Sequence, residues 1–288
     1  MNGFVTFFLY EDVLIVLLIF MFEHRVCVYY YPQCPWIVPT IDSIFRAARK
    51  LGYECCTYDL LSEGLNEKAL FKVYVDGNAV PIGIGMTDVN DIVNRLLGAN
   101  VSFREQEPSE TAFSYMPKKE SAGKVDISLL SGDNMEDEIS LCIGEDFLYG
   151  GIPQRFMNKA VEMKKRWLQH MLSKFKACGY IAHFKKEPVG FVEFVPGELA
   201  NMLGIETNYP PKQTAEILCL YVKKAYWGLK IGSKLIQRLI NDLLRTEYKY
   251  VEVTAYKSGV WHPLDFYLKN NFKIVKDLGS NVKMAYYL

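Results

Sequence analysis

The sequence predicts an α/β (α+β) protein built of two folding units that are joined by a linker. In the first unit, residues 25–98, the expected elements follow the order β-α-β and then β-β-α. In the second unit, residues 125–288, an apolar run is followed by a glycine-bearing turn and a strongly amphipathic helix. Residues 99–124 mix charged residues, serine, threonine and proline without sustained periodicity, which is typical of a linker. A length of 288 residues suits two domains of about 100–200 residues each.

The composition narrows the classes of partner and compartment. Half of the residues are apolar and 14% are aromatic, so each unit can bury a substantial core. The formal net charge is zero, which gives no reason to expect nucleic acid or an anionic membrane as a partner. Seven cysteines do not suggest a disulfide framework, and their odd number leaves at least one free thiol. We therefore expect a reducing, cytoplasmic setting, while the sequence does not indicate the oligomeric state.

The first 24 residues stand apart from this pattern. Their apolar run Val13–Phe22 is shorter than the roughly 20 residues that cross a bilayer, so no membrane span is expected. Acidic rather than basic residues precede the run, which is unlike a secretory signal. Three interpretations stay open: a buried segment packed on the first unit, translation ahead of a true start at Met21, or a short membrane-touching anchor. The stretch "MFEHRVCVYYYPQCPW" is typical of the start of a domain, which favours the second.

Local patterns define the elements of the first unit, 25–98. Asp76–Gly77 between two apolar runs is a strong hairpin signal. Thr87 is a good N-cap for a helix that closes at Leu97, and Gly98 stands just past its end. The earlier helix has one apolar face and a glycine at its end. The expected strands are Arg25–Tyr31, Glu54–Leu60, Lys72–Val75 and Ala79–Ile82, and the expected helices are Thr40–Leu51 and Thr87–Leu97.

The order of these elements resembles the thioredoxin fold. A dithiol enzyme of that fold needs two cysteines separated by two residues, but Cys34 is followed by "PWI", so no internal disulfide can form there. The cis-proline that the fold places before its third strand is also missing, because no proline lies between Pro39 and Pro81. The resemblance implies a degenerate thioredoxin-like domain that serves as a scaffold for binding. A role of Cys34 as a monothiol or a ligand anchor stays open.

The second unit carries two long helical patterns. Arg155–Phe175 has an apolar residue every four positions from Met163 onward, and Leu235, Leu239 and Leu243 recur at the same spacing. Short apolar runs between turn residues indicate strands. The expected strands are Val125–Leu130, Gly179–Phe184, Pro188–Val195, Ala215–Val222, Tyr250–Thr254, Phe272–Lys276 and Val282–Tyr287, and the other expected helices are Asn134–Cys142 and Pro263–Asn270.

The turn between Ala215–Val222 and the following helix has the chemistry of an anion site. A helix N-terminus leaves about four backbone N–H groups unpaired, and its dipole favours negative charge. Gly228 and Gly232 would let this backbone approach a ligand closely. A pyrophosphate or similar group is therefore expected near residues 228–233. The alternative is an ordinary tight loop between a strand and a helix.

The stretch "AEILCLYVKKAYWGLKIGSKLIQRL" resembles the acetyl-CoA-binding motif of the GNAT superfamily of N-acetyltransferases. "GYIAHFKKEPVGFVEF" before it and "FYLKNNFKIV" after it extend the resemblance over roughly residues 125–288. Gly228 and Gly232 are in register with the family motif. Trp227 stands where arginine or glutamine is usual, and Lys230 replaces the middle glycine. The resemblance implies a GNAT acyl-CoA N-acyltransferase domain with a mixed, splayed central sheet, and a first domain like the thioredoxin-like domains fused to some bacterial acetyltransferases.

The resemblance also assigns roles to backbone groups. In this family the strand before the motif carries a bulge and separates from its neighbour, so that Leu220, Tyr221 and Val222 pair with pantetheine and polarise the thioester carbonyl. Preorganised N–H groups stabilise the charge that builds on this oxygen, and one is worth about 10²–10³ in rate. The pyrophosphate of acetyl-CoA is expected on the glycine turn, with contacts from Trp227, Gly228, Leu229, Lys230, Ile231, Gly232 and Ser233.

Proton transfer calls for a base and an acid, because a lysine-type amine has a pKa of about 10.4 and must lose a proton. Glu216 aligns with the glutamate that histone-type family members use as base; alternatively, it is a strand-end carboxylate facing solvent. Burial on an apolar strand face favours a protonated carboxyl, which makes Glu193 the second candidate base. Tyr267 stands where family members place a tyrosine that protonates the leaving thiolate; alternatively, it is a buried aromatic with its hydroxyl at the surface. His262 is expected to be structural.

These features predict an N-acetyltransferase that moves the acetyl group of acetyl-CoA to a small-molecule or peptide amine by direct attack. The acceptor pocket is expected between Gly144–Arg155 and Pro196–Thr214, which hold acidic and aromatic residues. The four histidines show no metal-ligand spacing with the cysteines, so no metal is expected. Two alternatives stay open. One is a non-catalytic CoA-binding or sensor protein whose first domain docks a partner, and the other is a thiol enzyme centred on Cys34.

Overall fold

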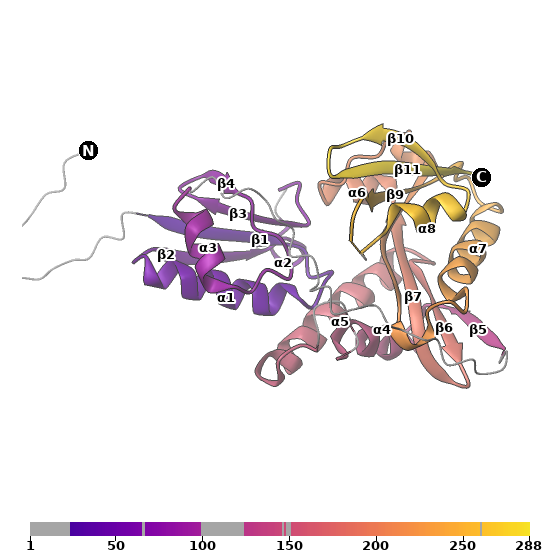
Figure 1. Ribbon diagram of the computed structural model, residues 1–288, viewed down its shortest axis with the longest axis horizontal. Coiled ribbons are helices and arrows are strands. Elements are labelled where there is room, and N and C mark those ends of the chain that lie inside the picture. The colour runs from indigo at the N-terminus through magenta and orange to yellow at the C-terminus, as the bar shows by residue number, and fades with distance from the viewer. Residues whose placement is uncertain (1–23, 65–66, 99–123, 146, 148–150, 260) are drawn as a thin grey trace, which may run out of the picture.

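The computed structural model describes residues 24–64, 67–98, 124–145, 147, 151–259 and 261–288. Their strands form two sheets, one for each predicted unit (Figure 1). The predictions for residues 1–24 and for the linker at 99–124 fall almost wholly outside the described residues. Within the described ranges, no helix combines the length and the apolarity needed to cross a bilayer.

The first unit is a four-stranded sheet in the order β2-β1-β3-β4. Strand β1 runs parallel to β2 and antiparallel to β3, which forms a hairpin with β4. The hairpin turn has φ of 51° at Asp76 and 82° at Gly77, as a turn with two left-handed residues requires. The predicted strands and helices follow one another in the predicted order, but the short helix α2 between β2 and β3 was not predicted. The thioredoxin-like assignment stays a prediction. The elements are β1 (Arg25–Tyr30), α1 (Ile37–Lys50), β2 (Glu54–Asp59), α2 (Leu60–Glu63), β3 (Phe71–Val75), β4 (Asn78–Val80) and α3 (Val89–Leu96).

Two helices of this unit begin at other residues than predicted. Helix α1 begins at Ile37 and includes Pro39 in its first turn. A proline is tolerated there because the first N–H groups of a helix have no acceptor within the helix. The N-cap of α3 is Asp88 rather than Thr87, since the Asp88 carboxylate accepts two backbone N–H groups of the first turn, each at 2.8 Å.

A disulfide joins Cys27 of β1 to Cys56 of β2, which the cysteine count did not predict. The two residues are separated by 29 positions in the chain but lie opposite each other in the parallel strand pair, with their Cα atoms 4.7 Å apart. The other five cysteines are free. Strand register, which the sequence does not reveal, therefore decided which cysteines meet.

The second unit is a seven-stranded mixed sheet in the order β10-β11-β9-β8-β7-β6-β5. Helices α4, α5 and α6 lie on one face of the sheet and α7 lies on the other (Figure 1). Helix α6 was not predicted. The elements are β5 (Val125–Leu129), α4 (Met135–Ile143), α5 (Met157–Lys174), β6 (Gly179–Phe184), β7 (Glu187–Pro196), α6 (Gly197–Met202), β8 (Thr214–Val222), α7 (Ile231–Leu243), β9 (Tyr250–Tyr256), α8 (Leu264–Lys269), β10 (Lys273–Asp277) and β11 (Asn281–Tyr287).

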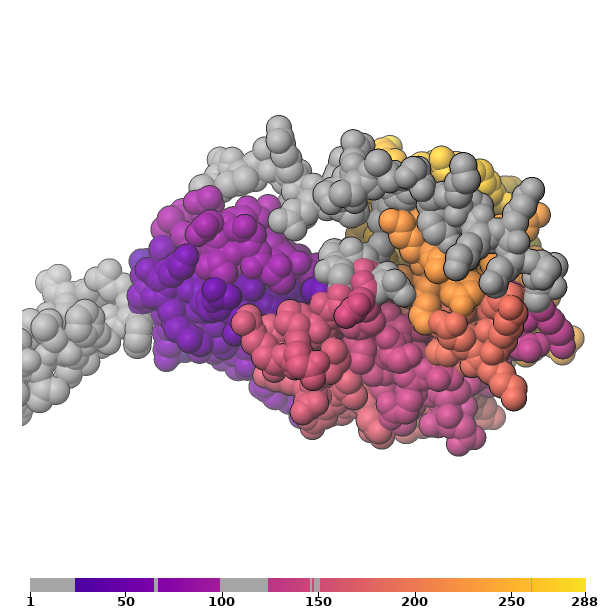
Figure 2. Space-filling view, turned by 60° about the horizontal axis from the view of Figure 1, so that its bottom comes forward, coloured from indigo at the N-terminus to yellow at the C-terminus, as the bar shows by residue number. Residues whose placement is uncertain are grey.

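The two units share one hydrophobic core. A single cluster of buried side chains contains residues of β1 and α1 together with residues of α4, α5 and β8. At the edge of this contact, Arg166 on α5 donates to the carboxylate of Asp59 and to the hydroxyl of Ser62, the latter at 2.8 Å. At a second contact, a Cβ on Gly204 would lie 2.7 Å from the carbonyl oxygen of Lys68. Figure 2 shows the first unit against the surface formed by α5.

Candidate active site

Strand β8 lies at the centre of the candidate site. It pairs with β7 along its length but with β9 only from Thr214 to Ile217. The register between β7 and β8 shifts at Leu218, which makes this residue a bulge, and Glu193 on β7 lies opposite Cys219 just beyond it. Strands β8 and β9 separate after Ile217, so the sheet is both mixed and splayed as predicted.

The backbone of Leu220 and Val222 faces this opening. The N–H of Lys223 donates to the carbonyl of Val189 on β7 at 2.8 Å, and hydrogen-bonded pairs alternate along an antiparallel ladder. Tyr221 is therefore bonded to β7, whereas Leu220 and Val222 direct their N–H and C=O groups away from it. Of the three residues predicted to contact pantetheine, the structure thus turns two toward the opening, and the Tyr221 backbone points the other way.

The glycine turn and the start of α7 present backbone donors to one place. Gly228 and Lys230 adopt left-handed conformations with φ of 82° and 59°, and the helix begins at Ile231. The N–H groups of the first helical residues, Ile231 to Ser233, have no acceptor within the helix, and no acidic residue occupies the first turn. This end of α7 suits an anion. The left-handed backbone at Lys230 explains why the family usually has glycine there.

Two residues of the predicted phosphate site also have structural partners. A Cβ on Gly232 would lie 3.1 Å from the ring of Phe266, so this glycine lets α7 pack against α8. The indole N–H of Trp227 donates to the carbonyl of Val222 at 2.8 Å. Trp227 therefore links the turn to the end of β8. Because the Val222 carbonyl accepts this hydrogen bond, only the N–H of Val222 remains directed at the opening.

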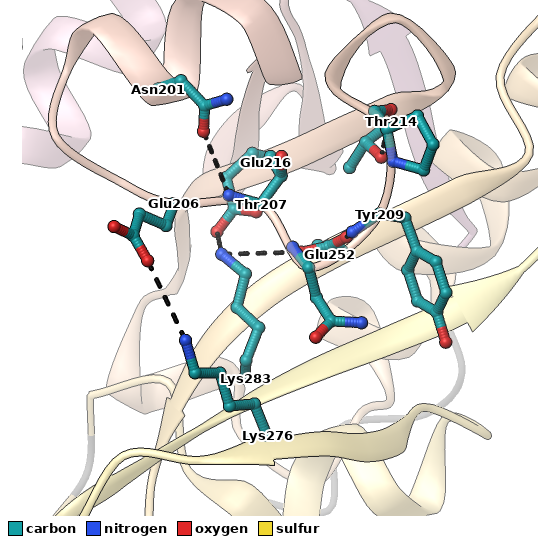
Figure 3. Close-up of polar contacts among 11 residues, drawn as sticks. Asn201, Glu206, Thr207, Tyr209, Thr214, Glu216, Glu252, Lys276 and Lys283 are labelled. Carbon is teal, nitrogen blue, oxygen red and sulfur yellow. Dashed lines mark hydrogen bonds and ion pairs between the residues drawn. The ribbon is translucent and has the colours of Figure 1, made fainter.

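Glu216 is buried beside the splay rather than facing solvent, with 1% of its surface exposed (Figure 3). One of its carboxylate oxygens, Oε1, accepts a hydrogen bond from Nζ of Lys283 at 2.8 Å. The other oxygen, Oε2, has no hydrogen-bond partner among the described residues. Burial raises the pKa of Glu216 to about 7, while the charge of Lys283 opposes the rise. The reading of Glu216 as an exposed strand-end carboxylate is therefore wrong.

Lys283 belongs to a buried group of charged residues that was not predicted from the sequence. Its Nζ also lies 3.8 Å from Glu252 on the neighbouring strand β9. The carboxylate of Glu252 accepts the backbone N–H groups of Asn208 and Tyr209, each at 2.8 Å (Figure 3). Glu252 on β9 thus fixes the position of the loop that follows α6, next to the strand β8 that carries Glu216. A lone charged residue in each of the apolar runs "YVEVTAY" and "NVKMAYY" is the signal that a buried ion pair leaves in the sequence.

Tyr267 on α8 is fully buried and has a specific partner. Its hydroxyl lies 3.1 Å from Nδ1 of His262, which is itself buried. Burial lowers the pKa of His262 to about 3, so its ring is neutral. Burial also raises the pKa of Tyr267 well above its usual value, and the charges of Cys219 and Glu216 add to the rise. The predicted surface position of the hydroxyl is therefore wrong, and His262 is a hydrogen-bond partner of the candidate acid.

Glu193, the second candidate base, is completely buried with both oxygens occupied. Its Oε2 accepts hydrogen bonds from Nε2 of Gln33 at 2.9 Å and from Nζ of Lys164 at 2.7 Å. Its Oε1 accepts one from the indole N–H of Trp167. Lys164 also pairs with Glu138 on α4 at 2.9 Å, and burial raises the pKa of Glu138. This network joins the first unit to α4, α5 and β7, and only Glu193 within it was predicted as a site residue.

The surroundings of Cys34 do not support a thiol enzyme. Cys34 is a free thiol whose pKa is raised by burial to about 11, which opposes formation of a thiolate at neutral pH. A metal site finds no support either. Within the described part of the chain, no three histidine, cysteine, aspartate or glutamate side chains are grouped so that they would hold a metal ion.

Comparison with known families decides the class of the second unit. Residues 151–270 match the family model described as the acetyltransferase (GNAT) family. These residues form a GNAT acetyltransferase domain. The GNAT domain as matched runs from the segment before α5 to the end of α8, so it includes β8, the glycine turn and Tyr267. The resemblance noted in the sequence is confirmed for this part of the chain.

Several solved structures are similar to the chain. The "paia" N-acetyltransferase from Thermoplasma acidophilum, in complex with coenzyme A, is 20% identical over 57% of this chain and 99% of its own, with a TM-score of 0.42. An acetyltransferase from Thermus thermophilus is 15% identical over 57% and 97%, with a TM-score of 0.40. Ard1 from Thermoplasma volcanium is 15% identical over 57% and 97%, with a TM-score of 0.39. No curated protein matches the chain, so the family assignment of the GNAT domain rests on the sequence match.

Proposed function

We propose that residues 125–288 transfer the acetyl group of acetyl-CoA to an amine by direct nucleophilic attack. The observation that carries this proposal is the state of Glu216. It is buried beside the opened end of β8, its Oε2 has no hydrogen-bond partner among the described residues, and its pKa is about 7. A general base works best when its pKa lies near the operating pH.

The backbone offers acetyl-CoA two sets of donors. The N–H groups of Ile231 to Ser233 at the start of α7 suit the pyrophosphate, since they combine unpaired donors with the positive end of the helix dipole. The N–H groups of Leu220 and Val222 at the opening between β8 and β9 suit the pantetheine arm and the thioester. Gly228 and Lys230 shape the turn between these two sets.

The proposed reaction is balanced by two proton transfers. Acetyl-CoA supplies a thioester carbonyl that is open to attack. The amine nitrogen forms a bond to the carbonyl carbon, the carbon–sulfur bond breaks, and no bond to the protein forms. Glu216 accepts the proton that the amine loses, and Tyr267 donates its hydroxyl proton to the departing thiolate. The N–H of Leu220 stabilises the negative charge that builds on the carbonyl oxygen.

Glu216 is a better candidate base than Glu193 because of its hydrogen bonds. A base needs a free lone pair within reach of the proton that it takes. Glu193 already accepts hydrogen bonds from Gln33, Lys164 and Trp167. Glu216 accepts one hydrogen bond, from Lys283 to Oε1, and its Oε2 has no hydrogen-bond partner among the described residues. We therefore assign Glu193 to the support of the site.

The test uses the full chain and two measurements. Calorimetric titration with acetyl-CoA measures binding, and a thiol reagent measures CoA release with phenethylamine, spermidine and a short peptide bearing a free N-terminus. We expect acetyl-CoA to bind and at least one amine to accelerate thiol release. Glu216→Gln should retain binding and lose most of the amine-dependent rate. A chain that does not bind acetyl-CoA would refute the proposal.

A CoA-binding or sensor protein is the second candidate function. The observation in its favour is that Glu216 is paired with Lys283 and almost wholly covered, as a purely structural carboxylate would be. Binding of acetyl-CoA without thiol release for any amine would support this role, with the first unit as the docking domain for a partner. The expected acceptor remains a small-molecule or peptide amine. The Cys27–Cys56 disulfide runs against the reducing, cytoplasmic setting that the cysteine count predicted.

A further inference from the structure

The loop between β1 and α1 inserts into the second unit. Within it, Gln33 and Trp36 have only 7% and 4% of their surfaces exposed. Tyr31, at the start of the loop, packs edge-on against Trp167 of α5 with ring centroids 6.3 Å apart. In a free-standing domain this polar and aromatic loop would be exposed, so its burial depends on the second unit.

Gln33 reaches the strand pair that carries the bulge. Its amide nitrogen donates to Oε2 of Glu193 at 2.9 Å, across 160 positions of sequence. Glu193 lies opposite Cys219, directly beside the register shift. The next residue on β8 is Leu220, whose N–H faces the opening. One hydrogen bond therefore links the first unit to the backbone that would bind the thioester.

Trp36 begins a chain of aromatic contacts that ends at the candidate acid. Its ring stacks on Phe147 with centroids 6.4 Å apart, and Phe147 contacts Tyr221 at 5.0 Å and Trp261 at 6.2 Å. The Trp261 ring lies 4.7 Å from His262, the hydrogen-bond partner of Tyr267. The loop thus contacts Glu193 beside the β8 bulge directly, and it is connected to Tyr267 on α8 through Phe147, Trp261 and His262.

The first unit lies on the side of the sheet to which Glu216 points. Residues opposite each other on paired strands point to the same face, so Glu216 and Cys219 share the face of Val195 and Glu193. Glu193 contacts α5, which identifies this face. The first unit contacts α5, which packs on this face (Figure 1). It also approaches Gly204, which follows α6.

We propose that the first unit is a working part of the transferase site rather than a separate module. Its 32–36 loop forms a wall on the acceptor side, and Gln33 is a positioning residue that holds Glu193, and through it the β8 bulge, in place. The inference rests on the proposed function for the role of the acceptor side. The link between Gln33 and the bulge is a structural claim that stands or falls separately.

The experiment compares three variants of the full chain. Gln33→Leu removes the hydrogen bond to Glu193 and Trp36→Leu removes the ring that faces Phe147. Ser62→Ala is the matched control, because it removes a hydrogen bond between the units, at 2.8 Å from Arg166, that involves neither Glu193 nor β8. Hydrogen–deuterium exchange of the 214–224 segment, acetyl-CoA affinity, kcat and the KM for the amine are measured for each.

For Gln33→Leu we expect amide exchange in 214–224 to quicken by about 10-fold and kcat to fall by about 10- to 10²-fold, since small displacements of catalytic groups have effects of this size. Trp36→Leu should raise the KM for the amine, and both variants should keep acetyl-CoA affinity. Ser62→Ala should resemble the parent in all four measurements. If Gln33→Leu does not fold, Gln33→Met, which keeps an unbranched side chain, replaces it.

Exchange and turnover that are the same in Gln33→Leu and Ser62→Ala would overturn the inference. Normal exchange with a lower kcat would also refute the link through the bulge. The exchange measurement needs no acceptor amine, so it decides the structural claim even if the chain proves to be a CoA-binding protein without turnover. Failure of the parent to bind acetyl-CoA would instead refute the proposed function.

Discussion

Lys283 donates a hydrogen bond to Glu216 at 2.8 Å, and the two form a buried pair beside the open end of β8. The pair explains how a carboxyl that is 1% exposed has a pKa of only about 7. Burial raises this pKa and the ammonium of Lys283 limits the rise. Without the lysine the carboxyl would stay protonated at neutral pH and would have no capacity to accept a proton.

Glu216→Gln should lower turnover on an amine by about 10²-fold and leave acetyl-CoA affinity unchanged, because the variant loses a general base and no CoA contact. In the parent, kcat should fall as pH drops below about 7, where Glu216 becomes protonated. The variant should lack this fall, and its deficit should shrink at high pH, where more amine is neutral. Measurements of kcat between about pH 5.5 and 9.5 test these two expectations, because this range covers the titration of Glu216 and approaches that of the acceptor amine. If Glu193→Gln shows this pH-dependent loss of turnover and Glu216→Gln does not, the general base is Glu193 on β7.

Lys283→Met should destabilise the fold more at pH 8 than at pH 5. The folded-state pKa of Glu216 lies above the ordinary glutamate value of about 4.3, so this residue contributes less stability as pH rises from that value through its folded pKa. Removing the lysine raises the folded pKa further, so that at pH 8 the carboxyl either takes up a proton or stays charged without its partner, and breaking a buried pair in this way costs about 3–5 kcal/mol. Urea unfolding at both pH values measures the difference.

The control for this variant is Lys276→Met, which removes a neighbouring lysine at the surface. Its ammonium lies 3.8 Å from Glu206 and its side chain is 54% exposed (Figure 3). Pairs of this kind contribute about 0–1 kcal/mol, so the free energy of unfolding should barely change at either pH. Equal losses in the two variants would contradict a special role of the Glu216 pair.

Lys230 offers a cleaner test of the phosphate site than Gly232, because any side chain at Gly232 would meet the ring of Phe266. Lys230→Gly should stabilise the fold by up to about 1 kcal/mol, since a left-handed backbone strains a residue that has a Cβ. If backbone donors hold the pyrophosphate, acetyl-CoA affinity should change little. Lys230→Glu should weaken binding strongly by placing a like charge at the start of α7. Calorimetric titration with acetyl-CoA measures the affinity of both variants. Equal acetyl-CoA affinities of Lys230→Gly and Lys230→Glu would exclude a phosphate site at the start of α7.

The Cys27–Cys56 disulfide should stabilise the first unit. It closes a separation of 29 residues, and such a link is worth about 2–4 kcal/mol through restriction of the unfolded chain. Cys27→Ser should therefore lower the melting temperature, and a reducing agent should then have no further effect. Cys55→Ser is the control, because Cys55 is a free cysteine and stands next to Cys56 in the sequence. Equal melting of the parent with and without reductant would show that the bond does not form in solution.

Local sequence patterns predicted the helices and strands, whereas the pairs of residues that are distant in sequence but in contact in the fold were not predicted. The hairpin at Asp76–Gly77 and the order strand, turn, helix around Gly228 follow from residues within a few positions of each other. The partners of the candidate site are far apart in sequence, as Gln33 and Glu193 show at 160 positions. A buried charge in an apolar strand marks that a partner exists, but only the register and the packing of the sheet determine which one.

Tyr267→Phe tests the proton that the leaving thiolate needs. The variant keeps the ring that packs against Phe272 and loses only the hydroxyl bonded to His262. We expect acetyl-CoA affinity to be unchanged and kcat to fall by about 10²-fold, the lower end of the range for a lost general acid. Because burial lowers the pKa of His262 to about 3, that ring stays neutral and the loss should not vary with pH between about 5 and 8.

The leaving group separates an acid from a merely structural tyrosine. An aryl thiol is more acidic than the thiol of CoA, so an acetyl thioester of an aryl thiol releases a less basic thiolate that departs without a proton. Acetyl transfer from this thioester should therefore be nearly equal in the parent and in Tyr267→Phe. If the variant is equally slow with both thioesters, the hydroxyl acts by supporting His262 and the structure around α8. If it is as fast as the parent with acetyl-CoA, the thiolate leaves unassisted, and the mechanism then depends on Glu216 and the Leu220 N–H alone.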